Sequence, residues 1–107
     1  MNKINCTVWR KGKLKACSFL KTYTETRDYD KQRSIDSGGI EVVTFGFWVN
    51  IGVTSFSSYL EKGKKYKIKI YKDGKKIRTW KRAILENVSH CDGITEYGFY
   101  IKKERKD

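Results

Sequence analysis

The feature that most constrains the fold of this chain is a β-hairpin whose register can be read from residues 66–80. Asp73-Gly74 lies at its centre, and this dipeptide is typical of a two-residue type I′ turn because both turn positions require a positive φ. Such a turn predicts two antiparallel strands with defined partners. On the face that we expect to point into the core, the predicted pairs are Lys72 with Lys75 beside the turn, then Ile70 with Ile77 and Ile68 with Thr79.

The opposite face of this hairpin is predicted to be almost wholly cationic. Its predicted pairs are Tyr71 with Lys76, Lys69 with Arg78 and Lys67 with Trp80. Directly opposed like charges such as Lys69 and Arg78 weaken a sheet by about 0.2–1 kcal/mol. Three alternatives account for the arrangement: a polyanion binds this face, an acidic protein surface covers it, or water alone solvates the long side chains.

The same face is the candidate binding site. Single-stranded nucleic-acid grooves combine cations, which bind phosphates, with flat aromatic rings, which stack on bases. A cross-strand cation–π contact between Trp80 and Lys67 is the purely structural alternative. The candidate polyanion-binding residues are Lys67, Lys69, Tyr71, Lys76, Arg78 and Trp80.

The composition favours an anionic partner. The chain has 107 residues, which is enough for a single domain over residues 1–107, and its net charge of +12 favours nucleic acid or an acidic protein. No stretch reaches the roughly 18 apolar residues of a membrane span, and the first residues lack the apolar segment of a secretory signal. We therefore expect a cytoplasmic protein without membrane insertion.

Turns divide the rest of the chain into further strands. Lys11-Gly12 and Cys91-Asp92-Gly93 each predict the centre of another antiparallel pair. The segment 40–51 is apolar on nearly both faces, as expected in a closed barrel or against a neighbouring subunit. We therefore expect a mainly β fold, a small antiparallel β-barrel of about seven strands. The predicted strands are 4–10, 14–20, 40–51, 66–72, 75–81, 83–90 and 94–103.

One short helix is expected at residues 54–63. Thr54 or Ser55 can cap its first turn, and Gly63 can end it. The side chains expected on its apolar side are Phe56, Tyr59 and Leu60. Beyond the last predicted strand, residues 102–107 form a charged tail.

The segment 22–39 is predicted to be a long inter-strand loop, because eighteen residues without clear periodicity exceed an ordinary connection. It holds four carboxylates against three cations in a chain that is otherwise strongly basic. The loop either docks on the basic surface of an identical subunit or folds onto its own barrel. The candidate subunit-contact residues are Tyr23, Glu25, Arg27, Asp28, Tyr29, Asp30 and Ile35.

Catalytic chemistry is not indicated. His90 and Cys91 are adjacent, and adjacent side chains of an extended chain point apart, which disfavours a nucleophilic pair. The ligand types for zinc or magnesium occur without the close spacing of a metal site. We therefore expect no enzymatic activity, no metal and no cofactor. The three cysteines, for which buried thiols are favoured over disulfides, are Cys6, Cys17 and Cys91.

The order of these features resembles the Hcp tube proteins of type VI secretion systems and the related phage tail-tube proteins. The resemblance is carried by a short basic hairpin, a short helix, a hairpin after Gly63 and a final strand, together with the segments 23–32, 37–43 and 83–89. It implies a β-barrel with a flanking helix that assembles into six-membered rings. It also implies that the loop 22–39 reaches a neighbouring subunit and that the rings stack into a tube.

Two functional hypotheses follow. In the first, the chain is a non-catalytic structural subunit that forms homo-oligomeric rings or a tube, as a hexamer if the resemblance holds, in a contractile injection or phage tail machine. In the second, it is a monomeric basic barrel that binds nucleic acid through the Lys/Arg/aromatic sheet face.

Overall fold

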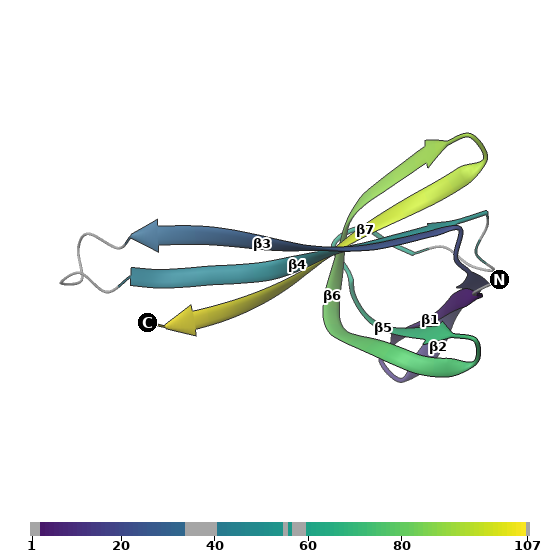
Figure 1. Cartoon of the computed structure of the whole chain (residues 1–107), viewed down its shortest axis with the longest axis horizontal. Helices are drawn as coiled ribbons and strands as arrows, with labels where there is room; N and C mark the ends of the chain where they lie inside the picture. The colour runs from purple at the N-terminus through teal and green to yellow at the C-terminus, as the bar shows by residue number, and fades with distance from the viewer. Residues whose placement is uncertain (1–2, 34–40, 55, 57–59, 107) are drawn as a thin grey trace.

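The computed structural model describes the backbone of residues 3–33, 41–54, 56 and 60–106, and their side chains except for 29–33, 41–44 and 103–106. The described residues form one sheet of seven antiparallel strands in the order β2-β1-β5-β6-β7-β4-β3 (Figure 1). A mainly β fold with about seven strands is therefore confirmed. The strands are β1 Ile4–Arg10, β2 Lys13–Phe19, β3 Thr22–Arg33, β4 Glu41–Val53, β5 Lys65–Lys72, β6 Lys75–Cys91 and β7 Ile94–Lys106.

The sheet is not closed, so the expectation of a barrel was wrong. Its two edge strands, β2 and β3, are joined only by Leu20 and Lys21. The N–H of Leu20 donates to the carbonyl oxygen of Ile4 over 2.7 Å, and the N–H of Lys21 donates to that of Gly52 over 2.7 Å. The edges therefore approach one another at this corner, but no ladder pairs β2 with β3, because β3 follows β4 away from the first hairpin.

Three strands extend beyond the rest of the molecule. Figure 1 shows β3, β4 and the C-terminal part of β7 running together as an arm, away from β1, β2 and β5. The molecule measures 51 × 29 × 26 Å and its radius of gyration is 16.0 Å. A compact domain of this length has a radius of gyration of about 13 Å. The arm accounts for this elongation.

The three predicted turn positions are confirmed, and each turn has two residues; the one predicted around Cys91-Asp92-Gly93 is formed by Asp92 and Gly93 alone. Positive φ values occur at Lys11 and Gly12 between β1 and β2, and at Asp73 and Gly74 between β5 and β6. The turn between β6 and β7 has the same form at Asp92-Gly93, with φ values of 52° and 77°. This pair of left-handed conformations matches the right-handed twist of the flanking strands.

The register of the 66–80 hairpin differs from the predicted one beyond its first two pairs. Lys72 lies opposite Lys75, and Tyr71 lies opposite Lys76, as the turn predicts. An irregularity at Ile77 then shifts the register of β6 by one residue. The observed pairs are Ile70 with Arg78, Lys69 with Thr79 and Ile68 with Trp80.

This shift reverses which β6 side chains face the core. Trp80 shares a face with the buried Ile68 and is 6% exposed, whereas Ile77 is 49% exposed. A one-residue shift moves a strand's side chains to the other face of the sheet. Burial of the large indole stabilises the fold by more than exposure of the smaller isoleucine destabilises it. Lys69 and Arg78 are therefore not opposed, and the predicted like-charge pair was wrong.

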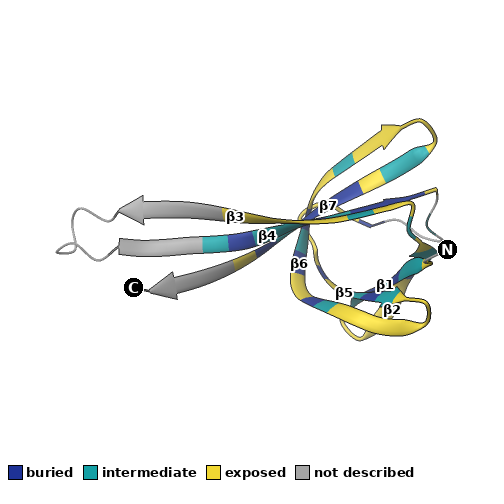
Figure 2. Ribbon diagram, in the orientation of Figure 1, coloured by how far each residue is buried: buried dark blue, intermediate teal, exposed yellow. Residues whose placement is uncertain are grey.

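The core lies on one face of the sheet, called here the inner face, and the other is the outer face. The largest fully buried side chains of the core include Phe99 on β7, Leu85 on β6 and Ile51 on β4. Figure 2 shows buried residues along β1, β5 and β7, and exposed residues over the tip of the β5–β6 hairpin. Phe56, which follows β4, also packs against the core, and its ring lies tilted against that of Tyr97 with 5.0 Å between ring centroids.

Three further expectations differ from the structure. No described residue of 54–63 is helical; residues 55 and 57–59 lie outside the described part. Residues 22–33 of the expected loop form strand β3, which pairs along its whole length with the doubly apolar β4, and only 34–39 lie outside. Most of the expected tail continues β7, whose Lys106 lies opposite Val42. Among the described residues there is no helix that is long and apolar enough to span a membrane.

Candidate polyanion-binding site

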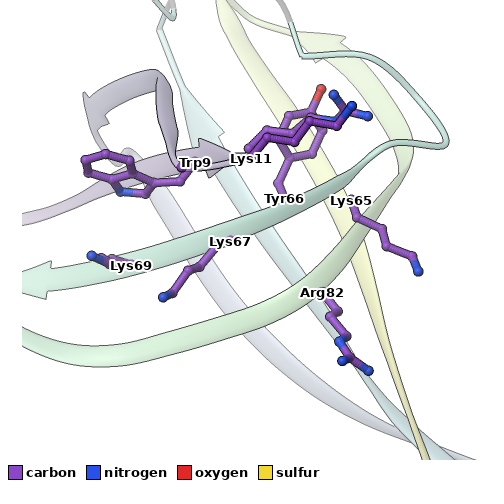
Figure 3. A pocket seen from close by; sticks show the side chains of 9 residues that line it. Trp9, Lys11, Lys65, Tyr66, Lys67, Lys69 and Arg82 are labelled. Atoms are coloured by element: carbon purple, nitrogen blue, oxygen red, sulfur yellow. The ribbon is translucent and has the colours of Figure 1, made fainter.

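A pocket of about 420 Å³ opens beside the first hairpin turn and strand β5. Six of its nine lining residues are cations, and none is acidic. None of the six forms an ion pair with a described carboxylate, since the one ion pair found among the described side chains joins Arg78 to Glu25. The lining residues are Trp9, Arg10, Lys11, Gly12, Lys65, Tyr66, Lys67, Lys69 and Arg82 (Figure 3).

Pairing of β1 with β5 brings Trp9 to the lysines. Trp9 lies opposite Lys67, and Thr7 lies opposite Lys69, so all four share the outer face. The indole Nε1 of Trp9 donates a hydrogen bond to Oγ1 of Thr7 over 2.8 Å. The ammonium of Lys69 lies 5.0 Å from the centroid of the Trp9 ring, within cation–π distance. Figure 3 shows Trp9, Lys67 and Lys69 along one side of the pocket.

Two of the cations have a backbone conformation that usually favours glycine. Lys11 has a φ of 52° in the hairpin turn, and Arg82 has a φ of 57° in β6. Arg82 lies where the β5–β6 register shifts, because Tyr66 pairs with Ala83 while Ile68 pairs with Trp80. A left-handed residue with a side chain costs about 1 kcal/mol or more relative to glycine. Such strain is concentrated at functional sites.

The core supports the pocket from behind. Tyr66 is 4% exposed, and its hydroxyl accepts a hydrogen bond from the N–H of Glu61 over 2.8 Å. Its ring meets Phe99 edge to face, with 6.3 Å between centroids. The lysines on either side of Tyr66 in the sequence, Lys65 and Lys67, are exposed. Lys65, Lys67 and Lys69 therefore project from strand β5, whose alternate side chains are buried in the core.

The six residues expected to bind a polyanion are separated by the sheet. Lys67 and Lys69 line the pocket, and Tyr71 lies on the same strand, opposite Lys76. Arg78 and Trp80 lie on the inner face because of the register shift. The lining residues that the sequence did not indicate are Trp9, Arg10, Lys11, Gly12, Lys65, Tyr66 and Arg82. The run Trp9-Arg10-Lys11 was a sequence signal for a basic site. It could not be linked to Lys67 and Lys69, because the pairing of β1 with β5 joins segments that are far apart in the sequence.

Arg78 and Trp80 belong instead to a hydrogen-bonded network on the inner face. Arg78 Nη2 lies 2.8 Å from Oε1 of Glu25, and its Nε reaches both carboxylate oxygens over 3.3 Å. The Tyr23 hydroxyl donates to Glu25 over 2.7 Å and accepts from the Trp80 Nε1–H over 2.9 Å. The hydrogen bond from Arg78 lowers the pKa of Glu25, and burial raises that of Tyr23. The network joins edge strand β3 to β6.

Six of the seven expected subunit-contact residues lie on strand β3. Tyr23 and Glu25 belong to the network with Arg78 and Trp80. The Asp28 carboxylate accepts a hydrogen bond from the Trp48 indole over 3.3 Å, and the Arg27 guanidinium lies 5.4 Å from the centroid of the Phe47 ring. Glu25 is therefore engaged within its own chain. Of the remaining residues, Tyr29 and Asp30 are paired through the backbone with Phe45 and Thr44, and Ile35 lies outside the described residues.

The side chains considered for catalysis are dispersed. His90 Nδ1 lies 2.9 Å from Oγ1 of Thr95 at an exposed position. Cys6 is buried, which raises its thiol pKa to about 12, but Cys17 and Cys91 are exposed, so buried thiols were expected wrongly for these two. No group of three or more His, Cys, Asp or Glu that could hold a metal ion occurs among the described residues.

In the part of the chain that the structure describes, polar side chains gather in the six-cation pocket on the outer face and in the Glu25–Arg78 network on the inner face. Comparison of the chain with protein families, with characterised proteins and with solved structures gives no match.

Proposed function

We propose that this protein is a non-catalytic module that binds nucleic acid through the basic pocket. The observation that supports the proposal is the convergence of six cations and one indole around a single pocket without a carboxylate. Like charges held this close repel one another, and a phosphate chain relieves the repulsion while releasing its own counterions.

The cations come from segments that are far apart in the sequence. Arg10 is the last residue of β1 and Lys11 follows it in the first hairpin turn, whereas Arg82 belongs to the irregular part of β6. Lys65, Lys67 and Lys69 are alternate residues of β5, so they project from the same side of the strand. Alternate residues of a strand are about 6.6 Å apart, so an extended phosphate backbone that follows β5 can contact them in succession.

The test is the salt dependence of binding to a thymidine oligonucleotide of about 10 nucleotides, a length within the usual range of single-strand sites. We expect the double variant Lys67→Gln/Lys69→Gln to bind more weakly. We also expect the slope of log K against log salt to fall by about 1.4, because each lost phosphate contact contributes about 0.7 on a single strand.

A matched control removes the same charge from the same hairpin outside the pocket. Lys72 and Lys75 are exposed and lie opposite each other beside the turn. The variant Lys72→Gln/Lys75→Gln should retain nearly the full salt slope. Equal losses in the two double variants would indicate an unspecific effect of net charge, and an absence of binding by the unaltered protein would refute the proposal outright.

A second candidate function is a structural subunit that self-assembles into rings or a tube, as in Hcp and phage tail-tube proteins. The elongated arm of β3, β4 and β7 favours it, because a sheet that projects beyond its own core offers surface and an unpaired edge to a second copy. Sedimentation and electron microscopy of the concentrated protein should then show closed rings or stacked tubes. A strictly monomeric profile at high concentration would exclude this function.

A further inference from the structure

We propose that the ligand of the basic pocket is single-stranded nucleic acid and that one unpaired base stacks on the ring of Trp9. This inference rests on the proposed function and adds the state of the strand and the residue that reads it. The observation behind it is the placement of Trp9, whose indole lies on the outer face among cations rather than in the core.

The orientation of the Trp9 ring is fixed within the protein. The Nε1–H donates to the Thr7 hydroxyl over 2.8 Å, so the one polar group of the indole is already satisfied. The residue is part-buried, and its neighbour across the ladder is the exposed Lys67. The ring can therefore offer a ligand only its π surface, in an orientation that needs no rearrangement on binding.

The other two tryptophans have partners within the chain. Trp48 packs against Tyr100 with 5.0 Å between ring centroids, and its indole donates to Asp28. Trp80 is 6% exposed and donates to Tyr23. Trp9 is thus the tryptophan that combines a part-exposed ring with a basic pocket.

The position of Lys69 suggests how a base would enter. Its ammonium lies 5.0 Å from the centroid of the Trp9 ring, so one ring face already attracts a group from outside the core. A base that stacks on this face takes the place of the ammonium, which then moves to the adjacent phosphate. Lys69 exchanges a cation–π contact for a charge-assisted hydrogen bond, and Lys67 supplies a second cation beside the ring.

A base pair inside a duplex cannot use such a platform, because both of its faces are covered by the neighbouring pairs. The arrangement therefore favours unpaired strands. A polyanion without bases would occupy the cations and leave the ring of Trp9 uncovered. These differences separate stacking from simple charge attraction.

The experiment compares three probes of equal length: a thymidine oligonucleotide, an abasic oligonucleotide with the same phosphates, and a blunt duplex. Affinity is measured by fluorescence anisotropy for the unaltered protein, Trp9→Leu and Trp9→Phe. We expect Trp9→Leu to lose about tenfold in affinity for the thymidine strand, as is typical of a lost stacking contact. It should lose nothing for the abasic strand, and Trp9→Phe should recover most of the affinity.

The unaltered protein provides a readout that does not depend on the folding of a variant. It should bind the thymidine strand more tightly than the abasic strand, and its tryptophan fluorescence should be quenched by the thymidine strand alone. Equal affinity for these two probes would overturn base stacking while leaving the proposed nucleic-acid function intact. Binding to none of the three probes would overturn both.

Discussion

At the scale of single residues, Arg82 connects backbone strain to the proposed site. Its φ of 57° is a conformation that glycine adopts without cost, and its side chain lines the basic pocket. Replacing a left-handed residue by glycine removes this strain, although the unfolded chain gains entropy. Arginine at position 82 therefore lowers stability relative to glycine and places a cation in the pocket.

We predict that Arg82→Gly weakens binding without destabilising the protein. The free energy of unfolding in urea should stay the same or rise by up to about 1 kcal/mol. Affinity for the thymidine oligonucleotide should fall. The matched variant Arg82→Gln keeps the left-handed strain and loses the charge, so it should weaken binding without any stabilisation. A clear loss of stability in Arg82→Gly alone would show that the conformation carries no strain.

A second prediction concerns the ion pair of Glu25 with Arg78. Arg78 holds the pKa of Glu25 below its ordinary value of 4.5, so the stabilisation is complete above the unfolded-state pKa. It is lost as the pH falls through the lower folded-state value. Glu25 and Arg78 side chains are 27% and 49% exposed, which limits the contribution to about 0.5–1 kcal/mol.

Glu25→Gln should therefore lower the free energy of unfolding more at pH 7 than at pH 2, because the carboxyl of the unaltered protein takes up a proton as the pH falls through its lowered pKa. Urea denaturation at both pH values measures the difference. The same destabilisation at both values would assign the effect to packing or to the Tyr23 hydrogen bond rather than to charge.

At the scale of elements, the two-residue turns were predictable and the irregularities within strands were not. Asp73-Gly74 has a local backbone requirement, and this requirement is visible in two letters of sequence. The register shift at Ile77 depends on which side chain of β6 fills the space over Ile68, and that space exists only after the sheet has formed. The sequence of β3 predicts a loop because its side chains are mostly polar. In the structure, such side chains bind distant partners, as Glu25 binds Arg78.

The third prediction tests the observed register of β6 with a pair of substitutions. Trp80→Ala should lower the free energy of unfolding by about 3–5 kcal/mol, because it empties a buried position and leaves the Tyr23 hydroxyl without a donor. Ile77→Ala should cost less than about 1 kcal/mol, because Ile77 is half exposed. Urea denaturation of the two variants decides between registers, since the uninterrupted hairpin requires the opposite order.

At the scale of the whole molecule, the mainly β fold and two of the nine residues that line the pocket could be read from the sequence. Lys67 and Lys69 alternate with buried isoleucines, and this period of two places them together on a solvated face. Trp9 and Arg82 reach the same pocket through the β1–β5 ladder and the irregular part of β6. A pairing between segments almost sixty residues apart has no local signal in a single sequence. The open sheet and its arm were hidden for the same reason.

Binding at the basic pocket can be tested by a map of amide chemical shifts in the labelled protein during titration with the thymidine oligonucleotide. We expect the shifting amides to cluster at residues 9–12, 65–69 and 82, around the basic pocket. The amides of Glu25 and Arg78 on the inner face should stay in place. Shifts confined to the inner face or to the arm, or no shifts at all, would contradict binding at the basic pocket.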